Sequence, residues 1–242
     1  LDQWEITNNE GAYFSIPKYA SIDEIPHQGF KLHVSATILN CTSVAEKVIP
    51  FLLENEIQFK VIKDIYTLID LNRGWLGYPQ IGKFITIYPK DPNEFKNLAK
   101  ILIDKTDSEY GPAIPTDKKI GDVLYYRFGS FLYKDGEKPL LTLPNGQVVE
   151  DKKTNPIPSW VEDPLHYSSD LINNAELPPH YFVTKAHRKN GKGGVYQILD
   201  FSKLPPVSRF MKESVPYGNM ELSGVDAVKR MKWEINLTKE LS

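Results

Sequence analysis

Residues 29–36 combine an apolar face with a face that could do chemistry. If this segment is a β-strand, successive side chains point to opposite faces, and Lys31, His33 and Ser35 then share one face. The apolar side chains that alternate with them form the other face. An ammonium, an imidazole and a hydroxyl in a row are unusual beside a core, but edge or solvated strands also carry such residues without a function. The segment alone leaves both interpretations open.

Further cations lie in or near other segments that we expect to be strands. They are Lys60, Arg73, Lys83 and Arg127. A single strand lysine most often protects a sheet edge or faces water. Several cations that converge on the ends of one sheet are harder to explain in this way, because like charges repel unless an anion is expected. Phosphate is the natural candidate, since arginine forks and lysine ammonium groups are its usual ligands.

The elements that must position these residues follow from hydrophobic spacing. Apolar alternation and β-branched residues predict strands at 29–36, 57–62, 82–89 and 123–128, and helical spacing predicts helices at 42–55, 66–72 and 91–102. Residues 1–28 read as an irregular lead-in with short extended pieces, and residues 135–179 show no sustained period. Beyond them we expect two strands within 181–201, a third at 209–212 and an amphipathic helix at 224–241.

Composition narrows the classes of function. A formal net charge of −2 over 242 residues argues against a general nucleic-acid binder. Cys41 is the only cysteine, which excludes an internal disulfide and a cysteine-based zinc site and suits a reducing cytoplasm. No apolar run approaches the roughly 20 residues that span a bilayer. We therefore expect a cytoplasmic protein without nucleic-acid or membrane partners, and the missing initiator methionine indicates a piece of a longer chain.

Several short motifs occur in the order and spacing of a known family. They are Lys-Leu-His-Val-Ser-Ala at 31–36, Phe-Lys at 59–60, Gly-Lys-Phe-Ile-Thr-Ile-Tyr-Pro at 82–89, Gly-Pro at 111–112 with Asp117, and Tyr-Tyr-Arg-Phe-Gly-Ser-Phe at 125–131. Residues 25–135 thereby resemble the N-terminal lyase domain of class III and class IV lanthipeptide synthetases. That domain is similar to the phosphothreonine lyases that bacterial pathogens direct against host kinases.

The resemblance implies β-elimination of phosphate from phosphoserine or phosphothreonine, which gives dehydroalanine or dehydrobutyrine without a metal or cofactor. Lys60 matches the general base, and neighbouring cations would favour the neutral form that it needs. His33 matches the general acid that protonates the departing oxygen. Lys31 either binds the phosphate or polarises the substrate carbonyl. The residues that match phosphate ligands are Arg73, Lys83 and Arg127.

The second half resembles the N-lobe of a protein kinase. Gly-Lys-Gly-Gly at 191–194 would cover nucleotide phosphates, and Lys212 would pair with Glu234 on the following helix. The glycine spacing departs from the usual kinase pattern, so a plain hairpin turn is the alternative. No His-Arg-Asp or Asp-Phe-Gly motif follows. We expect ATP or GTP with Mg²⁺ to serve only a full-length kinase domain, and we expect no complete kinase activity here.

These interpretations combine into an α+β fold with a mixed, mostly antiparallel sheet flanked by helices, followed by a partial kinase-like lobe. We predict a lyase domain at 1–165 with its core motifs at 29–131, a proline-rich linker at 166–179 and the truncated lobe at 180–242. The predicted substrate is a phosphorylated leader–core precursor peptide, and kinase and cyclase domains would accompany the lyase in the full-length chain. The alternatives are a non-catalytic phosphopeptide-binding module and a kinase lobe with a regulatory domain.

Overall fold

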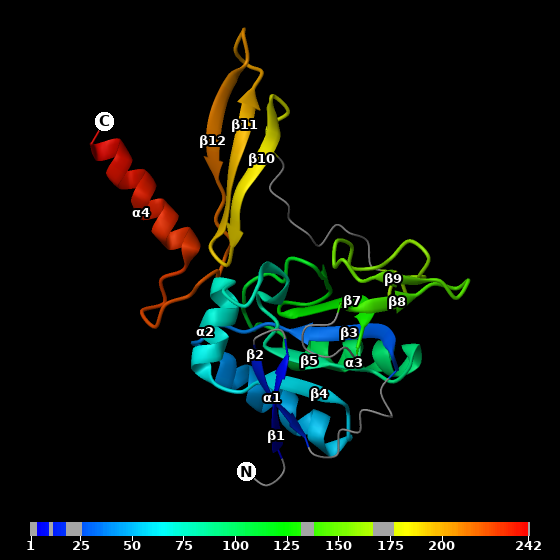
Figure 1. Ribbon diagram of the computed structural model, residues 1–242. Helices are drawn as coiled ribbons and strands as arrows, with labels where there is room; N and C mark the ends of the chain where they lie inside the picture. Colours follow the sequence, from blue (N-terminus) through cyan, green and yellow to red (C-terminus); the bar gives the residue numbers. More distant parts are fainter. Residues whose placement is uncertain (1–3, 10–11, 18–25, 132–137, 167–176, 242) are drawn as a thin grey trace.

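The computed structural model shows the chain as two parts, each with its own sheet (Figure 1). It describes residues 4–9, 12–17, 26–131, 138–166 and 177–241. The first part carries a seven-stranded sheet with helices packed against it, and the second carries a three-stranded sheet and one helix. The predicted α+β fold class is thus confirmed.

Every strand pairing in the described part of the large sheet is antiparallel, as the mostly antiparallel prediction requires. The strands lie in the order β1-β2-β4-β5-β3-β7-β6. Their bounds are Trp4–Asn9 for β1, Ala12–Pro17 for β2, Gln28–Val34 for β3, Phe59–Ile62 for β4, Ile85–Ile87 for β5, Lys118–Lys119 for β6 and Leu124–Ser130 for β7. The four predicted strands are therefore present, although β5 is shorter because a tight turn at Gly82 precedes it. Strands β1 and β2 lie where the sequence predicted short extended pieces within an irregular lead-in; their pairing into the large sheet was not predicted.

The three helices predicted in the first half are present as α1 (Cys41–Glu54), α2 (Ile65–Arg73) and α3 (Pro92–Lys105). The side chains of Asp64 and Asp91 cap α2 and α3 by accepting backbone N–H groups, and Gly74 ends α2 in the left-handed conformation. A short 3-10 helix, Tyr78–Gln80, follows α2. None of the described helices combines the length and apolarity that crossing a bilayer requires.

The apolar face of β3 packs against α3. The rings of Phe30 and Phe95 stack with their centroids 4.9 Å apart, and Tyr126 of β7 lies against both. Apolar side chains from α1, α3, β3, β4, β5 and β7 complete this core. One face of the central strand is thereby fixed by packing, which leaves its other face for Lys31 and His33.

The segment after β7 covers the sheet where the sequence showed no period. It forms a hairpin, β8 (Leu140–Thr142) and β9 (Val148–Glu150), and then continues through residues 151–165, which we call the strap. The backbone N–H of Phe128 donates to the carbonyl of Pro156 at 2.7 Å. The carboxylate of Asp163 accepts hydrogen bonds from the Tyr126 hydroxyl at 2.8 Å and the Lys118 ammonium at 2.7 Å. The strap is therefore fastened to β6 and β7 by polar contacts that apolar periodicity does not reveal.

The second part consists of β10 (Tyr181–Asn190), β11 (Gly193–Asp200), β12 (Val207–Lys212) and α4 (Ala227–Glu240). The three strands form one antiparallel sheet in chain order. The three strands and the helix match the elements predicted from the sequence, and their arrangement is compatible with a kinase N-lobe. That identity, like the predicted domain boundaries, stays a prediction.

We expect Phe95→Ala to lower the free energy of unfolding by about 3–5 kcal/mol, because it removes a fully buried ring that stacks on β3. Ile101→Ala is the matched control, since Ile101 lies on the same helix but is 37% exposed. Urea unfolding followed by circular dichroism measures both changes. Equal losses for the two variants would show that packing on β3 does not hold α3 in place.

Candidate active site

The register of the sheet places Lys60 and His33 on one face. In β5, Thr86 is the partner of Lys60 on one side and of His33 on the other. Directly opposed residues of antiparallel strands point to the same face, so the three side chains form a row. Lys60 and His33 are two strands apart, about 10 Å between their backbones. A substrate group lying over Thr86 would therefore be flanked by both.

Arg127 lies on the same face of the sheet, on strand β7 next to β3. It is the partner of Lys31 on β7, and Lys31 lies two residues from His33 on β3. The Lys31 ammonium lies 5.8 Å from the ring centroid of Tyr88 and 5.7 Å from that of Phe131. The predicted residues Lys31, His33, Lys60, Lys83 and Arg127 are thus brought together, which the sequence could only infer from motif order.

Arg73, the remaining predicted phosphate ligand, makes its described contacts elsewhere. It is the last residue of α2, and its Nε donates to Oδ1 of Asn219 at 3.3 Å. Its guanidinium carbon lies 4.9 Å from the ring centroid of Trp75. Its role in phosphate binding stays a prediction.

The site is more enclosed than an alternating strand pattern indicates. His33 is 3% exposed, Lys31 8% and Arg127 2%, so both faces of β3 are covered. The loop that carries Asp117 covers one end of this face, where the Ser35 hydroxyl donates to the carbonyl of Pro112 at 2.7 Å. Alternation therefore identified the two faces correctly, but the loop that buries the second face lies far away in sequence.

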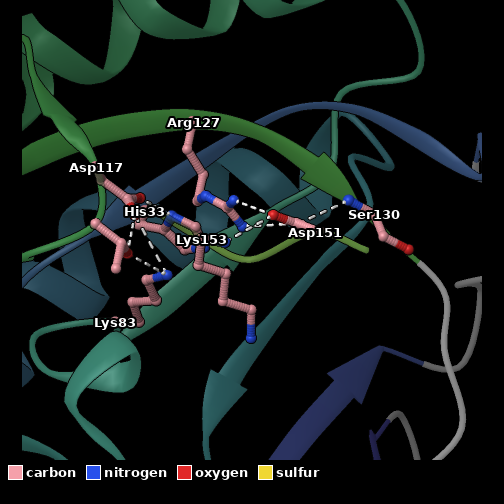
Figure 2. Close-up of polar contacts among 8 residues, drawn as sticks. His33, Lys83, Asp117, Arg127, Ser130, Asp151 and Lys153 are labelled. Atoms are coloured by element: carbon pink, nitrogen blue, oxygen red, sulfur yellow. Dashed lines mark hydrogen bonds and ion pairs between the residues drawn. The ribbon is translucent and has the colours of Figure 1, made fainter. Parts of the chain in front are cut away.

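Asp117 connects His33 to Lys83 (Figure 2). The Nδ1 of His33 donates to Oδ2 of Asp117, and the Lys83 ammonium lies 3.3 Å from Oδ1 of the same carboxylate. The Thr116 hydroxyl donates to that Oδ1 at 2.7 Å and accepts from Lys83 at 3.2 Å. Binding through Nδ1 fixes the imidazole tautomer, so Nε2 is the nitrogen that would exchange a proton with a ligand.

The buried cations set the protonation states of the site. Burial lowers the pKa of His33 to about 3 against the opposing pull of Asp117, and Lys83 and Lys31 add to the lowering. Burial, together with Arg127, Lys60 and Lys83, holds the pKa of Lys31 well below its ordinary value. Burial alone would raise the pKa of Asp117, but Lys83 and His33 hold it well below its usual range. Without a bound anion, the imidazole is neutral and Asp117 is ionised.

A second carboxylate, Asp151 at the start of the strap, holds Arg127. Its oxygens accept hydrogen bonds from Nη2 and Nη1 of Arg127 at 2.6 and 3.1 Å. The same carboxylate accepts the backbone N–H groups of Ser130 at 3.3 Å and Lys153 at 3.2 Å. Sequence reasoning missed both Asp151 and Lys153, because the run 150–153 cannot be told from a solvated charged loop. Asp117 was noticed only as part of a motif, without a role.

In the second part, the Lys212 ammonium forms an ion pair with Glu234 on α4, as the sequence predicted. A cavity of about 260 Å³ lies between the hairpin β10–β11 and α4, and its lining includes Lys192, Gly193, Lys212, Arg230 and Glu234. The predicted nucleotide-binding roles of Lys212 and Glu234 stay predictions, as does the kinase identity of this lobe.

Comparison with known proteins places this chain in a family. The family described as "RamC, N-terminal domain" matches residues 1–176. The chain therefore belongs to this family, which confirms the resemblance to the N-terminal part of a lanthipeptide synthetase seen in the sequence. It is similar to the probable SapB synthase of Streptomyces coelicolor, with 32% identity over 232 residues. That alignment covers 90% of this chain but only 25% of the relative, so the chain spans about a quarter of that protein's length.

We expect His33 to stay neutral from pH 8 to pH 5 in the free protein and to gain a proton when inorganic phosphate binds, because a nearby dianion raises its pKa. Nitrogen-detected NMR of the imidazoles measures this, with His33→Gln to assign the signal. A His33 signal that titrates near its ordinary value of 6.5 in the free protein would contradict the burial effect.

The lowered pKa of His33 also makes the stability of the fold depend on pH. Since the unfolded chain takes up this proton near pH 6.5 and the folded chain only near 3, the free energy of unfolding should fall as the pH drops through that window.

Proposed function

We propose that this chain is a phosphoserine and phosphothreonine lyase that eliminates phosphate from a peptide to leave dehydroalanine or dehydrobutyrine. The observation that carries the proposal is the buried imidazole of His33, fixed by Asp117 and placed on one sheet face with Lys60. A binding clamp needs cations, but it does not need an oriented imidazole opposite a lysine.

The charge balance of the site supports an anionic substrate. Among the described residues, five cationic side chains share this region with two carboxylates; the cations are Lys31, Lys60, Lys83, Arg127 and Lys153, and the carboxylates are Asp117 and Asp151. Mutual repulsion of buried cations is unfavourable unless an anion lies among them. A phosphate dianion would relieve it, and Arg127 and Lys83 are already oriented by their carboxylates.

Elimination would proceed with each group in a stated role. Neutral Lys60 would take the Cα proton, the Cα–H electron pair would form the double bond, and the Cβ–O bond would break toward the phosphate. His33, protonated once the dianion is bound, would give the proton on Nε2 to the bridging oxygen. A lysine accepts a proton only when neutral, and the repulsion between Lys60 and Lys31 favours loss of a proton from one of them.

Lys31 would either bind the phosphate or polarise the substrate carbonyl, since it lies two residues from His33 on β3 and is the cross-strand partner of Arg127. In the carbonyl role, a hydrogen bond from Lys31 would acidify the Cα proton that Lys60 removes, and phosphate binding would fall mainly to Arg127 and Lys83.

The substrate in this proposal is a phosphorylated lanthipeptide precursor with leader and core segments. Phosphorylation with ATP or GTP and Mg²⁺, and ring formation by a cyclase, would belong to other domains of the full-length protein. The lyase itself would use no cofactor, because its own side chains supply the acid, the base and the cations.

The test is a synthetic phosphoserine peptide incubated with the chain and followed by mass spectrometry. We expect loss of the mass of phosphoric acid, and we expect Lys60→Ala to lower kcat by about 10²–10⁴-fold, as removal of a general base does. Lys63→Ala is the matched control, since Lys63 follows β4 immediately and is exposed.

Two outcomes would count against the proposal. Unchanged peptide under conditions where it binds would leave a phosphopeptide-binding module in place of a lyase. Full turnover by Lys60→Ala would keep the reaction but remove Lys60 as its base.

A further inference from the structure

The turn at the start of the strap connects two basic side chains through one carboxylate. Asp151 binds the guanidinium of Arg127 with two hydrogen bonds and also accepts the backbone N–H of Lys153. Asp151 is 6% exposed, so this connection lies inside the protein. The carboxylate that holds the guanidinium of Arg127 therefore also holds the backbone of Lys153.

Lys153 occupies a backbone conformation that disfavours a lysine. Its φ is +53°, in the left-handed region, where residues with a β-carbon are about 1–2 kcal/mol less stable. Glycine or asparagine would fit this turn better. Strained backbone persists where the surrounding structure enforces it, and it is concentrated at functional sites.

The side chain of Lys153 adds positive charge to a region that already has a surplus. Figure 2 shows it leaving the turn beside Arg127, with its ammonium pointing away from the contacts that join Asp117, Lys83 and Arg127. The charge of Lys153 contributes to the lowered pKa of Lys83, after burial and Arg127. Lys153 is only partly exposed, so part of the residue packs against the protein.

We propose that Lys153 is a further phosphate-binding residue of this site, with Asp151 as the positioning residue that aligns it with Arg127. The proposal rests on the lyase function proposed above for the identity of the phosphopeptide, but it stands for any phosphate-bearing ligand of the site. The strap then supplies a ligand to the anion as well as a cover for the sheet.

The test compares Lys153→Ala with Lys152→Ala, which removes the same charge from the adjacent, exposed residue. We expect Lys153→Ala to weaken binding of inorganic phosphate, measured by calorimetry, by about 10- to 100-fold and to raise KM for a phosphoserine peptide, with a smaller change in kcat. Lys152→Ala should change neither quantity more than about twofold, and Lys153→Arg should retain most of the affinity.

Lys153→Gly separates binding from folding, because glycine relieves the strained backbone while removing the side chain. We expect it to keep or raise the melting temperature and still lose phosphate affinity. If Lys153→Gly and Lys152→Ala bind phosphate equally well, the proposal is wrong. If wild-type protein binds phosphate but does not convert the peptide, the lyase proposal fails while Lys153 keeps its role.

A second, independent observation concerns the glycine-rich turn between β10 and β11. The backbone N–H of Gly191 donates to the carbonyl of Arg73 at 3.1 Å, at the C-terminus of α2, where helix carbonyls lack partners within the helix. A β-carbon on Gly191 would lie 1.7 Å from the carbonyl oxygen of Asn72. Glycine is therefore required here by close approach of two backbones.

Neighbouring side chains extend this contact between the two parts. Arg73 donates to Asn219, and the ring centroids of Tyr110 and Tyr217 lie 5.1 Å apart. We infer that the glycine-rich turn docks the second part onto α2 and, through Asn219, holds the predicted phosphate ligand Arg73. A nucleotide phosphate that took the N–H of Gly191 would have to draw the turn away from α2.

Gly191→Ala tests the docking, with Lys192→Ala as control in the same turn. We expect Gly191→Ala to speed amide hydrogen exchange at residues 72–76 by at least tenfold and to increase the radius of gyration in small-angle scattering, while the far-ultraviolet spectrum stays unchanged. Lys192→Ala should leave both unchanged. Wild-type exchange and size in Gly191→Ala would overturn the inference.

Discussion

The burial of like charges over one face of the large sheet is the constraint on which the rest of the structure depends. Lys31, Lys83 and Arg127 are each less than a tenth exposed, and such a group would be strongly unfavourable without partners. Asp117 and Asp151 make it tolerable by binding Lys83 and Arg127 from opposite sides. Each of these two cations is thereby partly compensated by its own carboxylate.

The apolar half of the sheet provides the energy that holds this arrangement together. Phe30 stacks on Phe95 on the face opposite Lys31, so the strand that carries the cations is fixed by packing of its other side chains. The antiparallel register then determines which residues meet. Shifting β4 by one residue would turn Lys60 to the core face, since side chains alternate. Fold stability and site geometry therefore depend on the same pairings.

The sequence predicted elements and faces correctly where apolar and polar residues repeat with the period of a strand or a helix. Alternation in β3 separated Lys31 and His33 from the core, and helical spacing located α1, α2 and α3. It did not predict contacts between side chains that lie far apart in the sequence. The contact of Asp117 with His33 spans 84 residues, and that of Asp151 with Arg127 spans 24 through a segment without period. The contact of Asn219 with Arg73 depends on docking of two parts, which no local pattern encodes.

The electrostatics of the site also resolve a conflict in the proposed chemistry. Elimination needs a protonated imidazole and a neutral lysine close together, although imidazole is intrinsically the weaker base. In the free site, burial and the cations disfavour protonation of both His33 and Lys31. A phosphate dianion bound between Lys83 and Arg127 would raise the pKa most at the group nearest the bridging oxygen. In the proposed geometry that group is His33. The substrate's own charge would thus protonate the acid, while the base, two strands away, experiences less of it.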